Sequence, residues 1–241
     1  AADASQRRGR EIHTNQVLIG PGAKPFLFFP TLALVGPGDE VLYPDPGFPT
    51  YAAMIEVAGG TPVPVPLREA QDFSFDLEAF DRLVSPRTRL VVLNSPGNPT
   101  GGVMPLAALE HIAEAAKRFD FWVISDEIYA RLVYEAPAPS IADLPGMAER
   151  TVVCDGFSKT YAMTGWRLGY GIMPAALAER VELLLTHSIG CTASFTQVAG
   201  LRAVRGPQQP VDQMVAEYRR RRDVLVAGLN AIPGVTCRMP Q

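Results

Sequence analysis

Cysteine is scarce in this chain of 241 residues, and the three that occur, Cys154, Cys191 and Cys237, lie far apart. An odd number at such spacing predicts neither a disulfide framework nor a zinc site, and it fits free buried thiols in a reducing compartment. The three histidines likewise lack metal-ligand spacing. We therefore expect a cytoplasmic protein without a metal site.

The chain also lacks a surplus of positive charge and a long apolar run. Its formal net charge is -3, from 22 basic and 25 acidic residues, whereas nucleic-acid-binding domains normally carry a basic surplus. The four arginines at 219–222 are interpreted as the solvated face of a long helix. No apolar stretch has the length of a membrane span, and residues 1–10 are too polar for a secretion signal. We expect neither nucleic acid nor membrane as a partner.

Short apolar segments instead alternate with segments of helical spacing. Such alternation predicts a three-layer α/β/α domain with a mostly parallel central sheet, covered on both faces. The expected strands lie at 17–19, 40–43, 61–65, 89–93, 121–125, 151–154 and 168–173. The expected helices lie at 24–35, 49–58, 76–84 (with Asp76 as N-cap), 106–119, 175–188, 194–204 and 211–229.

Polar clusters follow three of these predicted strands. The clusters are residues 94–101, Asp126, and residues 156–159. Ligands of open α/β sheets bind at the carboxyl ends of the strands. The three clusters therefore predict one pocket. Glu127, beside Asp126, is interpreted as structural.

Three segments carry a family resemblance. Residues 155–170 (DGFSKTYAMTGWRLGY) resemble the lysine segment of class I/II aminotransferases, which use pyridoxal 5'-phosphate. Residues 94–101 (NSPGNPTG) resemble that family's Asn-Pro-Thr-Gly turn, and residues 125–129 (SDEIY) its Asp-Glu-x-Tyr segment. The resemblance extends over essentially the whole chain. It implies the large domain of a fold-type-I enzyme and ping-pong amino transfer from an L-amino acid to a 2-oxo acid. It also implies a homodimer with sites shared between subunits.

The cofactor's chemistry explains the residues that match around its ring. A lysine amine forms an imine with an aldehyde, and Lys159 matches the family's imine and proton-transfer lysine. A carboxylate keeps a pyridine nitrogen protonated, and Asp126 matches that position. Asn98 and Tyr129 match the donors to the ring's 3' oxygen, and Phe48 matches the aromatic side chain stacked on the ring.

Other residues match the family's phosphate site. Arg167 lies eight positions after the lysine and matches the phosphate arginine, whose planar fork suits a phosphate. Ser158 would add a hydroxyl, whereas Gly156 stands where some members carry a phosphate-binding serine. Ala23 and Lys24 open a predicted helix and match the family's backbone donors.

The resemblance further implies how the chain is divided. Residues 1–206 match the large domain without the N-terminal segment that covers substrate, and residues 207–241 match a linking helix and the start of a small domain. No residue matches the family's arginine for the substrate α-carboxylate. We therefore expect a portion of a longer protein, with a strand starting at Val235.

Two alternative functions stay open at the level of sequence. A pyridoxal-phosphate carbon–sulfur β-lyase shares these motifs, and its products, ammonia and pyruvate, would distinguish it. A non-catalytic sensor with an aminotransferase-like domain would carry a DNA-binding domain upstream. For a transferase, aspartate or an aromatic amino acid as donor and 2-oxoglutarate as acceptor are expected from the commonest family members.

Overall fold

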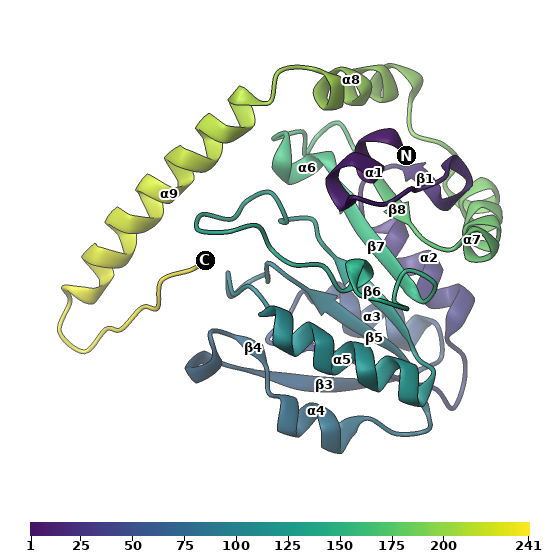
Figure 1. Ribbon diagram of the computed structural model, residues 1–241, viewed down its shortest axis with the longest axis horizontal. Coiled ribbons are helices and arrows are strands. Elements are labelled where there is room, and N and C mark those ends of the chain that lie inside the picture. The colour runs from purple at the N-terminus through teal and green to yellow at the C-terminus, as the bar shows by residue number, and fades with distance from the viewer.

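An eight-stranded sheet forms the centre of the computed structural model, which describes residues 1–241 (Figure 1). Its strand order is β1-β8-β7-β6-β5-β2-β3-β4. Neighbours from β7 to β3 are parallel, whereas β8 is antiparallel to β1 and β7, and β4 to β3. The prediction of a mostly parallel sheet is confirmed. The strands are β1 (Val17–Gly20), β2 (Glu40–Asp45), β3 (Thr61–Arg68), β4 (Ser74–Phe75), β5 (Thr88–Asn94), β6 (Trp122–Asp126), β7 (Thr151–Gly156) and β8 (Gly169–Ile172).

Each predicted helix is present, with ends displaced by a few residues at most. Asp76 caps its helix as predicted, because its side chain accepts a hydrogen bond from the Ala79 amide at 3.0 Å. The first helix was not predicted from the polar start of the chain. The helices are α1 (Ala2–Arg8), α2 (Pro25–Leu34), α3 (Thr50–Val57), α4 (Leu77–Leu83), α5 (Leu106–Phe119), α6 (Phe157–Thr160), α7 (Ala175–Ser188), α8 (Ser194–Arg205) and α9 (Gln209–Asn230).

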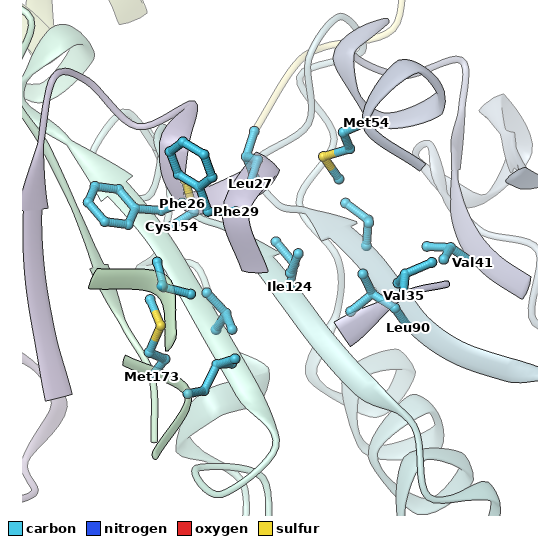
Figure 2. Close-up of a cluster of buried hydrophobic side chains, with 14 of the residues drawn as sticks. Phe26, Leu27, Phe29, Val35, Val41, Met54, Leu90, Ile124, Cys154 and Met173 are labelled. Atoms are coloured by element: carbon cyan, nitrogen blue, oxygen red, sulfur yellow. The ribbon is translucent and has the colours of Figure 1, made fainter. Parts of the chain in front are cut away.

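Helices pack on both faces of the sheet, which makes the three layers that the sequence predicts. On one face α2, α3 and α7 pack against the strands, and Figure 2 shows Phe26 and Leu27 of α2 among these side chains, near Ile124 of β6. On the other face the packing comes from α4 and α5. Alternate residues of β5 join the two clusters, so both of its faces are buried, as expected for a central parallel strand.

The C-terminal part of the chain is arranged differently. α9 projects away from the sheet, and residues 231–241 return toward it (Figure 1). The predicted strand at Val235 is wrong, because this segment pairs with no strand edge. Instead the Cys237 amide donates to Asn230 Oδ1 at 2.7 Å, and the Gln241 amide to the Gly101 carbonyl at 3.1 Å. The predicted division after residue 206 falls just beyond α8 and stays a prediction.

Two other expectations need correction. Only Cys154 is a buried thiol, since Cys191 is exposed and Cys237 partly exposed. Arg222 is not on a solvated helix face: its side chain is 9% exposed and its guanidinium lies 4.5 Å from the centre of the Tyr134 ring. The loop that carries Tyr134 covers this side of α9, which the run of arginines could not indicate. None of the helices combines the length and the apolar character needed to cross a membrane.

Candidate active site

A cavity of about 230 Å³ lies at the carboxyl ends of β5, β6 and β7. Its lining also comes from the turn before α2, the segment before α3 and the residues after β7. The structure brings together here every residue that the sequence predicted for the cofactor, although their individual roles stay predictions. These residues are Ala23, Lys24, Phe48, Asn98, Asp126, Tyr129, Ser158, Lys159 and Arg167.

Asp126 is the buried acid of this cavity. It ends β6, between Asn94 of β5 and Cys154 of β7 in the sheet register, and only 5% of it is exposed. The Tyr51 hydroxyl donates to Oδ2 at 2.8 Å, and the Ile128 amide to Oδ1 at 3.3 Å. Burial raises the pKa of Asp126 to about 6, although these two hydrogen bonds lower it. A cationic partner would therefore stabilise the ionised form of Asp126.

Tyr51 was missed by sequence reasoning. It is fully buried in α3, and its ring packs edge-on against Phe48 at 5.7 Å between centroids. Burial and the neighbouring Asp126 raise the pKa of the Tyr51 hydroxyl well above its ordinary value, which keeps it a donor. Its position three residues after Phe48 is the only signal in the sequence.

Asn94 was also missed, although it belongs to the polar cluster after β5. Its side-chain amide donates to the Asp126 carbonyl at 3.1 Å, and its Oδ1 accepts from the Asn98 amide at 2.8 Å. One side chain therefore joins the end of β6 to the turn that carries Asn98. The turn is closed by the Gly101 amide, which donates to the Gly97 carbonyl at 2.8 Å.

Lys159 lies where this cavity meets a wider one. It follows β7 on the short helix α6, and its Nζ lies 5.5 Å from the centre of the Tyr129 ring. A second cavity of about 580 Å³ shares Asn98, Tyr129, Ser158, Lys159 and Thr164 with the first. An amine at this junction can react with one molecule held over Asp126 and with another entering from the wider side.

The rim of the cavity carries positive charge. Arg167 adopts a left-handed backbone (φ 52°), and its Nη1 donates to the Thr164 carbonyl at 3.0 Å. Gly22 has a left-handed backbone (φ 92°), which favours glycine, and a Cβ there would stand 2.4 Å from Arg167 Nη2 and displace the guanidinium. Lys24 adds an ammonium 5.3 Å from the centre of the Phe48 ring, at the N-terminus of α2.

These groups fit pyridoxal phosphate. The molecule is a flat ring with a basic nitrogen, an aldehyde and a phosphate. A buried carboxylate, a lysine amine and a cationic rim next to a helix N-terminus are the complementary groups. The Phe48 ring supplies a flat apolar surface beside them.

Comparison with known proteins points to the same family as the sequence motifs do. The family model described as "Aminotransferase class I and II" matches residues 4–241. An aspartate aminotransferase of Musicola paradisiaca is 41% identical over 226 residues, which are 93% of this chain and 56% of that protein. An arginine–pyruvate transaminase of Pseudomonas aeruginosa is 39% identical over 230 residues, 95% of this chain and 58% of that protein.

A solved structure extends the similarity to three dimensions. The aromatic aminotransferase from Pyrococcus horikoshii superimposes with a TM-score of 0.96 and is 36% identical, covering 100% of this chain and 65% of that one. The fold is therefore that of fold-type-I transferases. The chain belongs to the class I and II aminotransferase family, whose members use pyridoxal phosphate. It spans somewhat more than half the length of the curated relatives it matches.

Proposed function

We propose that this chain binds pyridoxal phosphate and forms the cofactor-binding part of an aminotransferase. The enzyme would move an amino group from an L-amino acid to a 2-oxo acid in a ping-pong cycle. The observation that carries this proposal is the single cavity in which buried Asp126, the Lys159 amine and the cationic Arg167 meet.

Lys159 has two tasks in this proposal. Its amine would hold the cofactor covalently through the cofactor's aldehyde. As a base, the same amine would move a proton at the substrate α-carbon. Its position at the junction of the two cavities supports both tasks, because cofactor and substrate would approach it from different sides.

Asp126 would hold the ring nitrogen in its protonated form. When bound, the protonated ring supplies an electron sink for the bonds broken at the substrate. The Tyr51 hydroxyl fixes one carboxylate oxygen at 2.8 Å and so orients the acid. Asn98 and Tyr129 would bind the 3' oxygen, and Asn94 holds Asn98 in register with Asp126.

The phosphate would lie at the cationic rim. The Arg167 guanidinium, the Ser158 hydroxyl and the Ala23 and Lys24 amides would bind its oxygens, and Phe48 would cover the ring. The Lys24 ammonium, 5.3 Å from the centre of the Phe48 ring, would add positive charge beside the amide. Charge at this end and at Asp126 would fix the ring in one orientation.

A spectroscopic titration tests the proposal. We expect the purified chain to take up one pyridoxal phosphate with the absorbance shift of attachment to an amine, and glutamate to bleach that band. Absence of attachment would contradict the proposed function. Attachment followed by release of ammonia and pyruvate from a cysteine conjugate, without a new amino acid, would favour the β-lyase instead.

We further propose a homodimer in the cytoplasm with aspartate or an aromatic amino acid as donor. The names of the relatives from Musicola paradisiaca and Pyrococcus horikoshii support these donors, and three free thiols support a reducing compartment. An exposed apolar stripe on α8 supports the contact with a second copy. It consists of Phe195, Val198 and Leu201, and Phe195 is 71% exposed. Sedimentation equilibrium would show a dimer that Phe195→Ser weakens. A monomeric wild-type chain would contradict it.

A further inference from the structure

Asp126 is one of three carboxylates buried at the ends of β6 and β7. Glu127 and Asp155 are 6% and 7% exposed. Side chains alternate along a strand, so Asp126 contacts Tyr51 of α3 whereas Glu127 and Asp155 lie on the opposite side, toward α1. Asp155 and Glu127 both oppose the ionisation of Asp126, so a cation that neutralises either of them favours ionised Asp126.

Arg8 of α1 pairs with Glu127. Its Nη2 lies 2.5 Å from Glu127 Oε2, and its side chain is only 12% exposed. The Ser125 and Ser140 hydroxyls donate to the other carboxylate oxygen. Glu127 is therefore fully bonded, and its charge is balanced by a buried cation rather than by water.

Arg7, the preceding residue, reaches Asp155. Its Nη2 donates to the Tyr170 hydroxyl at 2.6 Å, and that hydroxyl donates in turn to Asp155. Arg7 Nη1 itself lies 3.7 Å from Asp155 Oδ2. The Gly156 amide binds the remaining oxygen at 2.6 Å. Arg7 also pairs with Asp3 at 2.8 Å and Arg8 with Asp143 at 3.2 Å. Burial raises the pKa of Asp155 to about 6 although Arg7 lowers it, so the Arg8–Glu127 pair is the stronger of the two.

We propose that α1 balances charge for the cofactor site: Arg8 neutralises Glu127, so that Asp126 stays ionised for the cofactor's ring nitrogen. This inference rests on the proposed function. Arg7 and Arg8 are positioning residues, because they act through neighbouring carboxylates. Neither of them bonds to the Asp126 carboxylate or lines the cavity. The remaining titratable groups near Asp126 are Tyr51 of α3, Cys154 of β7 and, in the cavity lining, Lys24, Tyr129, Lys159 and Arg167.

The direct test measures the Asp126 carboxyl in the cofactor-free chain. Aspartate labelled with ¹³C at the carboxyl gives its titration by NMR, and Asp126→Asn identifies its signal. In Arg8→Gln the unbalanced Glu127 should move the Asp126 midpoint to higher pH. The double variant Arg8→Gln/Glu127→Gln should return it. Arg10→Gln removes the same charge from a residue whose one ion pair, with Asp143, is 3.8 Å long, and should leave the midpoint unchanged.

Cofactor affinity gives a second readout. Burial raises the pKa of Asp126 to about 6, so a further rise of one unit would lower its ionised fraction at pH 6 about fivefold, from roughly one half to roughly one tenth. Pyridoxal phosphate should therefore bind Arg8→Gln about fivefold more weakly at pH 6, with affinity restored in the double variant. The loss should shrink as the pH rises above the new midpoint.

Several results would overturn the inference. One is an Asp126 midpoint that moves equally in Arg8→Gln and Arg10→Gln. Another is a shift that Glu127→Gln does not reverse, which would mean that Arg8 acts through packing. If Arg8→Gln does not fold, Glu127→Gln makes the reverse comparison, because it leaves the Arg8 cation unbalanced and should move the Asp126 midpoint to lower pH. A wild-type chain that binds no pyridoxal phosphate would contradict the proposed function, while the NMR titration still decides the charge balance.

Discussion

Different interactions stabilise two regions of the molecule. One is the sheet body, meaning the sheet with α1 to α8, and the other is the C-terminal arm, meaning α9 with residues 231–241. In the body, ionisable side chains are buried and joined by contacts between distant segments, such as Arg8 with Glu127 and Tyr51 with Asp126. The arm buries only Val211 and Val226 along a helix of 22 residues. Its ion pairs are mostly exposed, and exposed pairs contribute little. The geometry of the candidate site is therefore fixed in the body.

One contact of the arm departs from this rule and lies beside the site. The Arg222 guanidinium packs on the Tyr134 ring and pairs with Glu135 at 3.2 Å. Tyr134 and Tyr218 of α9 both line the wider cavity that shares Lys159. The arm thus reaches the proposed substrate side through a few residues, whereas the body encloses the proposed cofactor side.

The largest effect is expected at the one lysine that joins the two cavities. The chain has three lysines: Lys24, Lys117 and Lys159. Lys159→Ala should abolish covalent attachment of pyridoxal phosphate, because Lys159 is the one lysine that lines both cavities, whereas Lys24 lines the smaller one alone. Borohydride reduction followed by mass spectrometry measures the attached cofactor. Lys117→Ala is the matched control, since Lys117 pairs with Glu114 at 2.6 Å outside the site. An adduct that persists in Lys159→Ala would refute the assignment.

A substantial effect on stability is expected at the buried acid. The pKa of Asp126 is raised to about 6 in the folded chain, so the folded state holds this proton more tightly than the unfolded state does. The associated stability is present below pH ~4 and is lost as the pH rises through about 6. Asp126→Asn cannot ionise.

Urea unfolding at pH 4 and pH 8 measures this difference in the cofactor-free chain. Asp126→Asn should match wild type at pH 4 and exceed it by about 1–3 kcal/mol at pH 8, while binding the cofactor more weakly. Asp212→Asn, at an exposed position of the arm, should leave the pH dependence unchanged. Equal stability of Asp126→Asn and wild type at pH 8 would contradict the raised pKa.

A smaller effect is expected where the arm meets Tyr134. Arg222→Ala removes a cation–π contact and an ion pair at a side chain that is 9% exposed, which should lower the free energy of unfolding by about 1 kcal/mol. Faster proteolysis within α9 should accompany it. Arg219→Ala removes a pair with the same Glu135 from a side chain that is half exposed. Arg219→Ala should lower the free energy of unfolding by less. An equal loss in both variants would mean that the burial of Arg222 adds no stability.

No measurable effect is expected on the outer face of the arm. Glu217 accepts hydrogen bonds from Arg220 and Arg221 at 2.8 Å, and these contacts lower its pKa to about 2. All three side chains are exposed to water, which screens such pairs. Urea unfolding of Glu217→Gln should therefore coincide with that of wild type. A clear loss of stability would mean that the arm depends on its surface charges.

Much of the candidate site could be predicted because its residues follow strand ends. Asn98, Asp126 and Lys159 belong to short segments placed directly after β5, β6 and β7, and parallel strands bring their carboxyl ends to one edge. Tyr51 could not be predicted in the same way. It lies inside a helix, and its role depends on the side of α3 that packs against the sheet.

The sequence by itself determined the alternation of strands and helices, the three-layer architecture and the polar segments at the strand ends, because these follow from local periodicity and chain order. Tertiary structure alone decided that β8 is antiparallel, that Gly22 makes room for Arg167, and that α1 lies against Glu127 and Asp155. Arg8 and Glu127 are 119 positions apart. Local patterns do not specify which distant charge will neutralise a buried carboxylate, since that pairing exists only once the layers have packed.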